Sequence, residues 1–219
     1  MKDSMPIPIA PSPPPRSTYR HGDLRRALLE AGVELARTGG PDAVVLREAT
    51  RRAGVVPNAA YRHFASRQAL LQAVRAAALS AVALAMEDEL SALRPTRKPA
   101  DFARASVRAV GTGYLRFAQA ETGLFRTAFA TAVDVEDAPA ETKSGQSGMN
   151  PFELLGAALD RLVDAGVMPA ERRPGAEFLA WSAVHGLALL IIDGPLRGMS
   201  REQTDALGQR LLDMVEKGL

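Results

Sequence analysis

The stretch that most constrains the fold is residues 44–64, VVLREATRRAGVVPNAAYRHF, which reads as two short helices joined by a tight turn. In the first helix, apolar or small residues recur at helical spacing and predict one buried face, at Val45, Leu46, Ala49 and Ala53. Gly54 can take the left-handed backbone conformation with which a helix ends and the chain turns. Pro57 suits the first turn of the next helix, because a backbone N–H there has no partner inside the helix.

The second helix, about residues 57–63, is short and polar, and we expect it to expose Asn58, Arg62 and His63. Helix, glycine turn and short polar helix is the plan of the helix-turn-helix, whose second helix enters the major groove of DNA. Two ordinary surface helices would show the same spacing. The charges favour an anion-binding face, because Glu48 is the one acid among five arginines, Arg47, Arg51, Arg52, Arg62 and Arg67.

The segment AGVVPNAAYRHFASRQALLQAV resembles the signature of the TetR family of bacterial transcription regulators. The resemblance extends over about residues 20–75, and the matching positions are Ala53, Gly54, Val55, Tyr61, His63, Phe64, Ser66, Arg67 and Leu70. It implies an all-α chain with a three-helix, helix-turn-helix DNA-binding domain, followed by a helical-bundle domain for ligand binding and dimerisation. We therefore expect a proline-rich tail over 1–18, a DNA-binding domain over 19–65 and the helical body over 66–219.

Two positions depart from the family pattern. The family usually has Ser or Thr where Val45 stands, and a polar residue where Val56 stands. A missing N-cap typically costs about 1 kcal/mol of stability. We also expect the DNA contacts that such hydroxyl groups often make to be absent, so the operator of a relative does not transfer to this chain.

The predicted DNA contacts fall into two groups by chemistry. Arg47 is suited to pair with guanine and Asn58 with adenine, while Val56 and Pro57 can touch thymine methyl groups. The resemblance implies that Tyr61, His63 and Arg67 contact phosphates. It implies the same for the start of the first helix, where Arg20 and His21 are the candidates. The complete predicted set is Arg20, His21, Arg47, Val56, Pro57, Asn58, Tyr61, Arg62, His63 and Arg67.

Composition excludes several classes of chemistry. The chain of 219 residues has no cysteine, which rules out disulfides and thiolate chemistry and fits a reducing cytoplasm, the location that we expect. No phosphate-binding loop, dinucleotide fingerprint, serine-hydrolase motif or histidine metal pattern appears, so we expect no cofactor, no metal and no enzymatic activity. We see no run of about 18 apolar residues, so no membrane span is expected.

The distribution of charged residues and of prolines differs between segments of the chain. Residues 1–75 hold 12 basic and 6 acidic side chains, a net charge of +6, whereas residues 76–219 hold 15 and 19, a net charge of −4. A basic head on an acidic body predicts that the head alone meets a polyanion such as double-stranded DNA. Residues 1–18 contain six of the fifteen prolines and should form an extended tail.

Helical patterns fill most of the remaining chain. They predict helices over 19–38, 66–93, 100–120, 123–130, 151–166 and 174–193, and a last helix after the capping-box sequence Ser200-x-x-Gln203. In the TetR family, the helix that begins after Ser66 transmits ligand binding to the head. The pair Gly111 and Gly113 indicates close packing or a kink beside a cavity. Residues 133–150, with four acids, read as a solvated loop. Acid clusters can also bind cations, but these acids lack a regular ligand spacing.

The stretch 174–193 is apolar nearly all round, so we expect it to be buried by the body on one side and by a second subunit on another. Paired with the last helix and their twofold mates, it would form a four-helix interface. The interface residues predicted are Leu187, Ile191, Leu207, Leu211 and Met214. Trp181, His185 and Gly186 also resemble a C-terminal TetR subtype marked by Trp, His and Gly.

Aromatic side chains of the body mark a predicted pocket for a small, largely apolar ligand, lined by Tyr114, Phe117, Phe125, Phe129, Phe152, Trp181 and His185. The alternative is that several of them fill the core, His185 above all. The function predicted is a homodimeric, ligand-responsive repressor on a palindromic operator. Two other functions remain open: a DNA-binding regulator without a ligand, which a body cavity of roughly 300 Å³ would argue against, and a small helical enzyme.

Overall fold

The computed structural model describes residues 21–94, 96–130 and 144–218, and these residues are helical without any strand. The elements are α1 (His21–Gly39), η1 (Pro41–Ala43), α2 (Leu46–Arg52), α3 (Pro57–Ala60), α4 (Arg67–Ser91), α5 (Pro99–Ala120), α6 (Thr122–Ala128), α7 (Pro151–Asp164), η3 (Ala170–Arg172), α8 (Ala176–Ile192) and α9 (Arg201–Gly218). The all-α prediction is confirmed. The predicted tail, Arg20 and most of the acidic loop lie outside the described residues.

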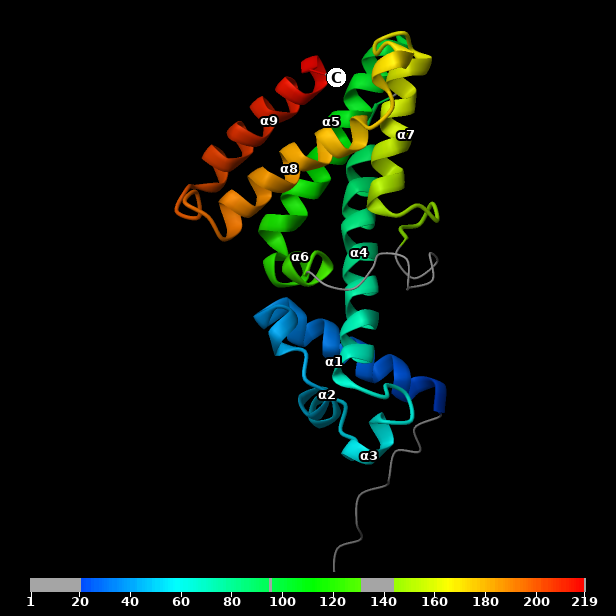
Figure 1. Cartoon of the computed structure of the whole chain (residues 1–219), viewed down its shortest axis with the longest axis vertical. Coiled ribbons are helices and arrows are strands. Elements are labelled where there is room, and N and C mark those ends of the chain that lie inside the picture. The colour runs from blue at the N-terminus through cyan, green and yellow to red at the C-terminus, as the bar shows by residue number, and fades with distance from the viewer. Residues whose placement is uncertain (1–20, 95, 131–143, 219) are drawn as a thin grey trace, which may run out of the picture.

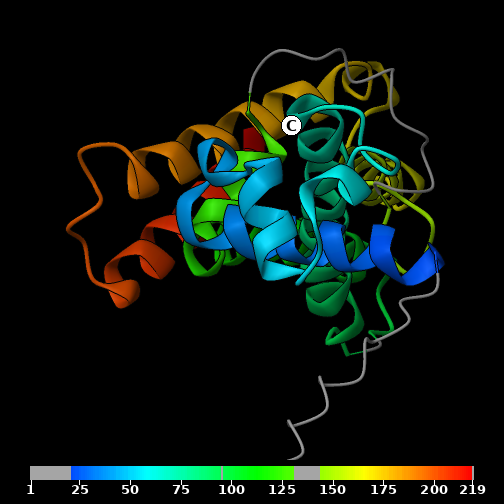
Figure 2. The same cartoon turned by 90° about the horizontal axis from the view of Figure 1, so that it is seen from below.

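The helices form a small head and a larger body joined by α4 (Figure 1). Helices α1, α2 and α3 make the head, and α4 runs from it along the full length of the body. Helix α6 lies at the end of the body that faces the head, above α1. Helices α8 and α9 lie beside each other and extend past the head on one side when the molecule is seen from below (Figure 2).

The start of α2 corrects one detail of the predicted buried face. Val44 and Leu46 are buried in the head, whereas Val45 between them is 42% exposed. Val45 is the N-cap of α2 and has extended backbone angles, φ −120° and ψ 127°. Side chains alternate along extended backbone, so residues 44–46 follow the period of a strand and not that of the helix.

The turn of the helix pair forms as predicted. Gly54 has φ +67°, and the N–H of Val55 donates to the carbonyl of Thr50 at 3.0 Å. Helix α3 is shorter than expected, because it ends at Ala60 and Tyr61 is its C-cap. The chain then turns back so that Phe64 packs in the head core at 2% exposure.

The N-caps of α2 and α3 are Val45 and Val56, and neither helix has a side-chain cap. We predict that Val45→Thr raises the free energy of unfolding by about 1 kcal/mol, since a threonine hydroxyl can accept a free N–H of the first turn. Urea denaturation of the purified chain measures the change. Val45→Ala is the control that adds no acceptor, and an equal gain in that variant would contradict the capping explanation.

Helix α4 begins as predicted, with Ser66 accepting from the N–H of Ala69 at 3.1 Å. Helix α4 is long and apolar enough to cross a membrane by length and composition alone, although Gln72, Arg75 and Ser80 interrupt its apolar residues. Its buried residues, Leu70, Val74 and Val82 among them, pack against α1, α5, α6 and α7. These are the contacts of a core helix, and a core helix meets the same criterion of length and apolarity.

Two glycines let helices approach α5 closely. A Cβ atom at Gly113 would lie 2.5 Å from the carbonyl oxygen of Ala85 on α4, and one at Gly111 would meet the side chain of Leu212 on α9. Helix α5 is continuous through both glycines. Close packing is therefore the correct interpretation of this pair, and Gly111 also borders the cavity described below.

Capping boxes begin α9 and α7. Ser200 and Gln203 exchange the predicted pair of hydrogen bonds, with the N–H of Gln203 donating to Ser200 Oγ at 3.2 Å. Asn150 and Glu153 form a second box at the start of α7 that the sequence analysis did not single out. Both boxes satisfy N–H groups that have no partner within the helix.

The structure places two residues of the predicted dimer interface, Leu187 and Ile191, inside this chain. Leu187 and Ile191 are 7% and 8% exposed, because they pack inside this chain and leave little surface for a second one. The apolar side chains that α8 leaves exposed include Leu179, Leu189 and Leu190, and Met214 is exposed on α9. A helix that is apolar all round has two sides to cover, and sequence periodicity cannot tell the inner one from the outer one.

Candidate DNA-binding face and body cavity

The structure places most of the predicted DNA-binding residues on the outer side of α2 and α3. Arg47, Asn58 and Arg62 are exposed, Val56 is 68% exposed and Tyr61 is exposed as well. Pro57 begins α3, His63 is half-buried just beyond it, and His21 is the first residue of α1. The head therefore exposes several side chains of the types that can read bases or bind phosphates.

The arginine cluster divides into paired and unpaired members. Arg51 donates two hydrogen bonds to the Glu48 carboxylate, which lowers the pKa of Glu48, and Arg52 lies 3.5 Å from the same group. Arg47 and Arg62 form no ion pair with any described residue. Their charge is therefore available to a polyanion, while Arg51 and Arg52 share the charge of Glu48.

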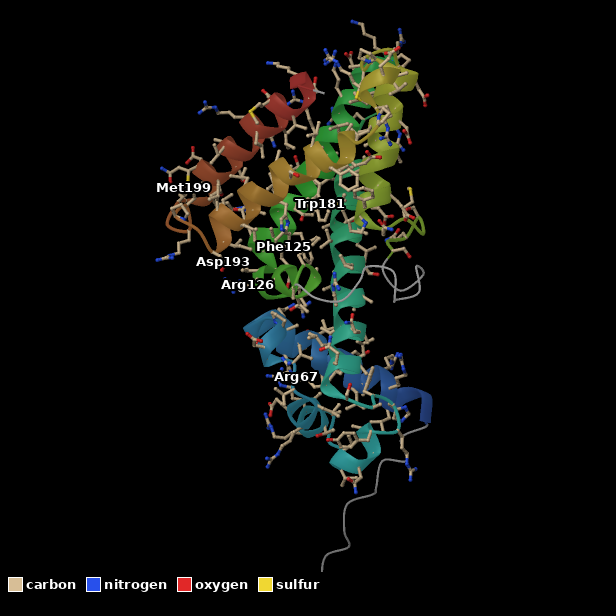
Figure 3. All side chains as sticks on the ribbon, in the orientation of Figure 1. Arg67, Phe125, Arg126, Trp181, Asp193 and Met199 are labelled. Atoms are coloured by element: carbon tan, nitrogen blue, oxygen red, sulfur yellow. The ribbon has the colours of Figure 1, made fainter. Side chains whose placement is uncertain are left out.

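Arg67 has a structural role that the sequence analysis missed. Its Nε donates to the carbonyl of Val44 at 2.8 Å, and one terminal nitrogen donates to the carbonyls of Pro41 and Asp42 at 2.9 and 3.4 Å. Arg67 lies where α4 enters the head (Figure 3). The guanidinium thus holds the segment before α2 against the start of α4.

Helix α6 connects the body to the head. A Cβ atom at Gly123 would lie 2.3 Å from the carbonyl oxygens of Ala36 and Arg37, so α6 rests directly on the end of α1. The same region carries an ion pair between Arg37 Nε and Glu121, at 2.8 Å.

The other side of α6 is tied to α8. Arg126 of α6 pairs through two nitrogens with Asp193, the C-cap of α8 (Figure 3). Contacts therefore run from the end of α8 through α6 to α1.

The body contains a cavity of about 370 Å³. Its wall is mostly apolar and comes from α4 to α9, with the lining residues Arg75, Leu79, Met86, Val107, Val110, Gly111, Tyr114, Ala128, Phe129, Asn150, Pro151, Phe152, Leu155, Phe178, Ala180, Trp181, Val184, Leu212 and Val215. Tyr114, Phe129, Phe152 and Trp181 of the predicted pocket belong to this wall. The aromatic rings of Phe152 and Phe178, 5.3 Å apart, are both exposed and border the cavity at the surface.

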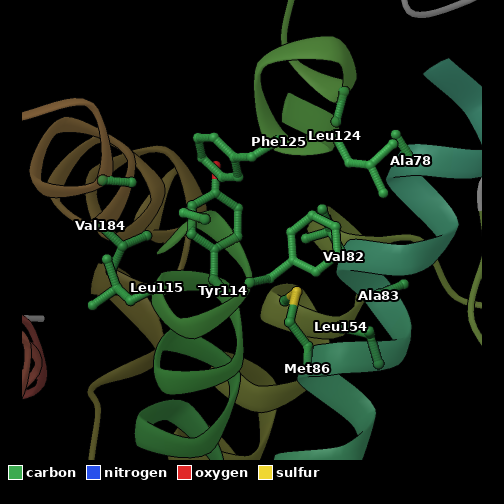
Figure 4. Packing of buried hydrophobic residues seen from close by; sticks show 14 of the residues in the cluster. Ala78, Val82, Ala83, Met86, Tyr114, Leu115, Leu124, Phe125, Leu154 and Val184 are labelled. Atoms are coloured by element: carbon green, nitrogen blue, oxygen red, sulfur yellow. The ribbon is translucent and has the colours of Figure 1, made fainter. Parts of the chain in front are cut away.

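Three residues of the predicted pocket are not in the wall. Phe117 is buried in the core of the body, and so is Phe125, whose ring lies 5.3 Å from Tyr114 and 4.9 Å from Phe129. Figure 4 shows Phe125 reaching from α6 toward Tyr114. His185 packs behind the wall, 5.7 Å from the Phe125 ring. Phe117 and Phe125 therefore fill the core, whereas His185 is half-buried beside the wall.

A hydrogen-bonded triad joins the wall to His185. Trp181 Nε1 donates to Tyr114 Oη at 3.1 Å, and Tyr114 Oη lies 2.7 Å from His185 Nδ1. Burial lowers the pKa of His185 and raises that of Tyr114. Both side chains are therefore neutral at pH 7, so the Tyr114 hydroxyl accepts from Trp181 and can donate to His185 Nδ1 in the tautomer that leaves this nitrogen unprotonated.

Sequence reasoning missed the aliphatic part of the wall, and also Arg75, Asn150 and Phe178. The aliphatic residues repeat at the same spacing as residues of a filled core, so no signal in the sequence separates the two. A second hollow of about 420 Å³ lies among α5, the end of α8 and the start of α9, with three arginines in its wall, Arg116, Arg197 and Arg201. Across the described ranges, no three metal-ligating side chains come together.

Two family models match the chain. Residues 28–74 match the model described as bacterial regulatory proteins, tetR family, and residues 107–215 match the one described as tetracyclin repressor-like, C-terminal domain. Together the matches cover more than two thirds of the chain, including the DNA-binding face and most of the cavity wall. No curated protein sequence matches the chain significantly.

Solved structures share the fold. A protein of unknown function from Rhodococcus sp. RHA1 is 26% identical, with a TM-score of 0.73 over 93% of this chain and 99% of that one. The TetR family regulator PfmR from Thermus thermophilus is 21% identical, with a TM-score of 0.54 over 88% and 98%. FadR from Bacillus subtilis, solved with stearoyl-CoA, is 14% identical, with a TM-score of 0.61 over 89% and 98%.

The two latter likenesses concern the fold, whereas the family models concern the sequence itself. Both models belong to one family, and they match in the order head and then body, as the helices are arranged. The chain belongs to the TetR family of bacterial regulatory proteins and is a DNA-binding transcription regulator.

Proposed function

We propose that the chain is a ligand-responsive repressor that binds a palindromic operator as a homodimer and releases it when a small, largely apolar molecule occupies the body cavity. The cavity carries this proposal. At about 370 Å³ it exceeds the lower limit of roughly 300 Å³ for ligand pockets, and its wall is apolar with a few polar groups. A body that served only for dimerisation would have no need of such a space.

The wall of the cavity supports a coupling to DNA. Leu79 and Met86 of the wall belong to α4, which begins in the head, and Phe129 follows directly on α6, which rests on α1. A ligand that binds the DNA-free arrangement better must lower DNA affinity by the same factor. A TetR-fold protein solved with stearoyl-CoA supports ligand binding by this kind of body.

The exposed apolar side of α8 and α9 supports the homodimer. Leu179 is 68% exposed and Met214 is 61% exposed, and exposed apolar surface of this kind favours a subunit interface. We propose that Leu179, Leu189, Leu190 and Met214 meet a twofold-related copy, with Leu207 and Leu211 at its border. Two heads related by a twofold axis would read two inverted half-sites.

The triad of Trp181, Tyr114 and His185 supports the Trp-His-Gly subtype as a further proposal. Two of the three marker residues, Trp181 and His185, both form hydrogen bonds with Tyr114. These bonds join α8 to α5 beside the cavity. Gly186, the third marker, has open space around its Cα position, so the contacts of this chain give no reason for it.

Asn58 is the proposed base reader of α3. We predict that Asn58→Ala weakens binding to the selected operator by about 1–3 kcal/mol, because one bidentate pair with adenine is lost. Binding to random DNA should stay the same, since the side chain carries no charge. Fluorescence-anisotropy titration of both DNAs measures the two affinities. An equal loss on both would show that Asn58 does not read sequence.

The test of the proposed function begins with DNA selection by the purified chain, followed by titration of the selected sequence at several salt concentrations. A palindromic sequence and a steep salt dependence would support a dimeric reader with several phosphate contacts. Failure to enrich any sequence in the presence or absence of candidate ligands would overturn it. An enzyme with a basic head would show weak binding to all DNA and no preferred site.

A further inference from the structure

We propose that ligands enter and leave the body cavity between the aromatic rings of Phe152 on α7 and Phe178 on α8, and that this ring pair sets the rate of ligand exchange. The inference rests on the proposed ligand response and names the entrance of the same site. It comes from the exposure of the wall residues, from the contacts that fix the two helix starts and from the mobility of exposed side chains.

The two rings mark the place where the cavity meets the surface. Of the nineteen described residues in the wall, Phe152 at 39% exposure and Phe178 at 60% are the only two that are exposed. Their ring centroids lie 5.3 Å apart, and the Phe152 ring lies 6.1 Å from the ring of Trp181, which is half-buried. The pair therefore stands between solvent and the buried part of the wall.

The α7 side of this entrance is held in place by hydrogen bonds. The Glu87 carboxylate of α4 accepts from the backbone N–H groups of Gln146 and Ser147, at 2.7 and 3.0 Å, in the turn that precedes α7. Asn150 caps α7, and its side chain accepts from the N–H of Phe152 itself at 2.9 Å. The backbone that carries the Phe152 ring is thus fixed to α4.

The α8 side of the entrance is held by Arg173, which lies just before α8. Its guanidinium pairs with Asp160 of α7 and with Glu177 of α8, both at 2.7 Å. It also donates to the carbonyl of Gly156 on α7 at 3.3 Å. Arg173 therefore joins the first turn of α8 to α7, which fixes the two backbone borders of the entrance relative to each other.

The rings themselves are the movable part of the entrance. Exposed side chains change rotamer within nanoseconds, much faster than packed helices move past each other. An aromatic pair is favourable by an amount that corresponds to about tenfold in an equilibrium constant, so the paired arrangement of the rings predominates. Removing either ring should raise the open fraction by about that factor. A ligand that passes only through the open arrangement would then both bind and leave faster.

Stopped-flow kinetics with N-phenyl-1-naphthylamine, a neutral apolar dye, test this entrance in the full-length chain. Trp181 is the sole tryptophan and lies in the wall, so energy transfer from it reports dye bound there. We expect Phe152→Ala and Phe178→Ala each to raise the association and dissociation rate constants about tenfold, while their ratio, the Kd, stays within about threefold. Losing a residue that only contacts the bound dye would change mainly the dissociation rate.

Phe102→Ala is the matched control for the two alanine variants. Phe102 is also exposed, at 36%, but it lies on α5 and is not among the described residues of the wall. Its removal should leave both rate constants within about twofold of the wild type. Circular dichroism and size-exclusion chromatography verify that each variant keeps its fold and its state of assembly.

A cross-link tests the same entrance in the opposite direction. The chain has no cysteine, so the double variant Phe152→Cys/Phe178→Cys introduces its only two thiols. Bismaleimidoethane should join them across the entrance, which mass spectrometry verifies. We expect the link to slow both rate constants at least about tenfold relative to the same variant treated with N-ethylmaleimide, which modifies both thiols without joining them. This measurement decides the outcome if an alanine variant fails to fold.

The outcomes separate the two proposals. Unchanged rate constants in folded Phe152→Ala and Phe178→Ala, a change in the dissociation rate alone, or undiminished exchange after cross-linking would overturn the entrance and leave the ligand response standing. No binding of the dye near Trp181 in the wild type would count against the cavity as a ligand site, and so against both the entrance and the proposed function.

Discussion

Gly113→Ala is expected to lower the free energy of unfolding by about 3 kcal/mol, the largest loss that we predict for a single methyl group. The added Cβ would lie 2.5 Å from the carbonyl oxygen of Ala85 and 2.7 Å from Met86 Cα. Both atoms belong to the backbone of α4, so no side chain can turn aside, and α4 and α5 must separate along their contact. Urea denaturation at fixed protein concentration measures the change.

Gly156→Ala is the matched control for this prediction. Gly156 also lies inside a helix, α7, but a Cβ atom there would have its nearest neighbour at 3.6 Å, an ordinary contact with Arg173. Alanine is preferred to glycine within helices by up to about 1 kcal/mol, so this variant should be as stable as the wild type or more stable. Equal stability of the two variants would show that α4 and α5 are not packed as closely as the structure has them.

Arg67→Ala is expected to lower both the stability of the head and its affinity for all DNA. The substitution removes hydrogen bonds to the carbonyls of Val44 and Pro41, and the loss should amount to about 2–3 kcal/mol. Without them the segment that begins α2 is no longer held against α4. If Arg67 also binds a phosphate, as the family resemblance implies, the salt dependence of binding should flatten by about one unit.

Arg67→Lys separates the two roles of this side chain. Lysine keeps the charge, so a phosphate contact and its salt dependence should survive. It has no planar fork of donors, so the two carbonyls cannot both be held and the thermal midpoint should stay low. Recovery of stability together with affinity would mean that charge alone matters at this position, and that the carbonyl contacts contribute little.

The sequence by itself determined the local structure of the turn in the head and of several helix starts. Gly54 takes the left-handed conformation, Ser66 caps α4 and Ser200 caps α9 because each depends on residues within a few positions along the chain. The signature around Tyr61 and Phe64 identified the family for the same reason, because its residues lie close together along the chain. The order and approximate ends of the body helices followed from periodicity together with the capping signals in the sequence.

Only the tertiary structure decided which side of each helix meets which neighbour. Phe117 and Phe125 have the same aromatic character as Phe129 and Phe152, yet the first two fill the core and the last two line the cavity. A cavity is the space that several helices leave between them, so no single stretch of sequence contains it.

The assignments of Leu187, Arg67 and Arg75 depended on long-range contacts in the same way. Leu187 turned out to pack inside the chain, Arg67 to hold carbonyls more than twenty positions away, and Arg75 to contact Ala128 across the body. Periodicity shows that a residue is apolar or charged at a given angle around its helix. The partner at that angle is set by how the helices pack, which is a property of the whole chain.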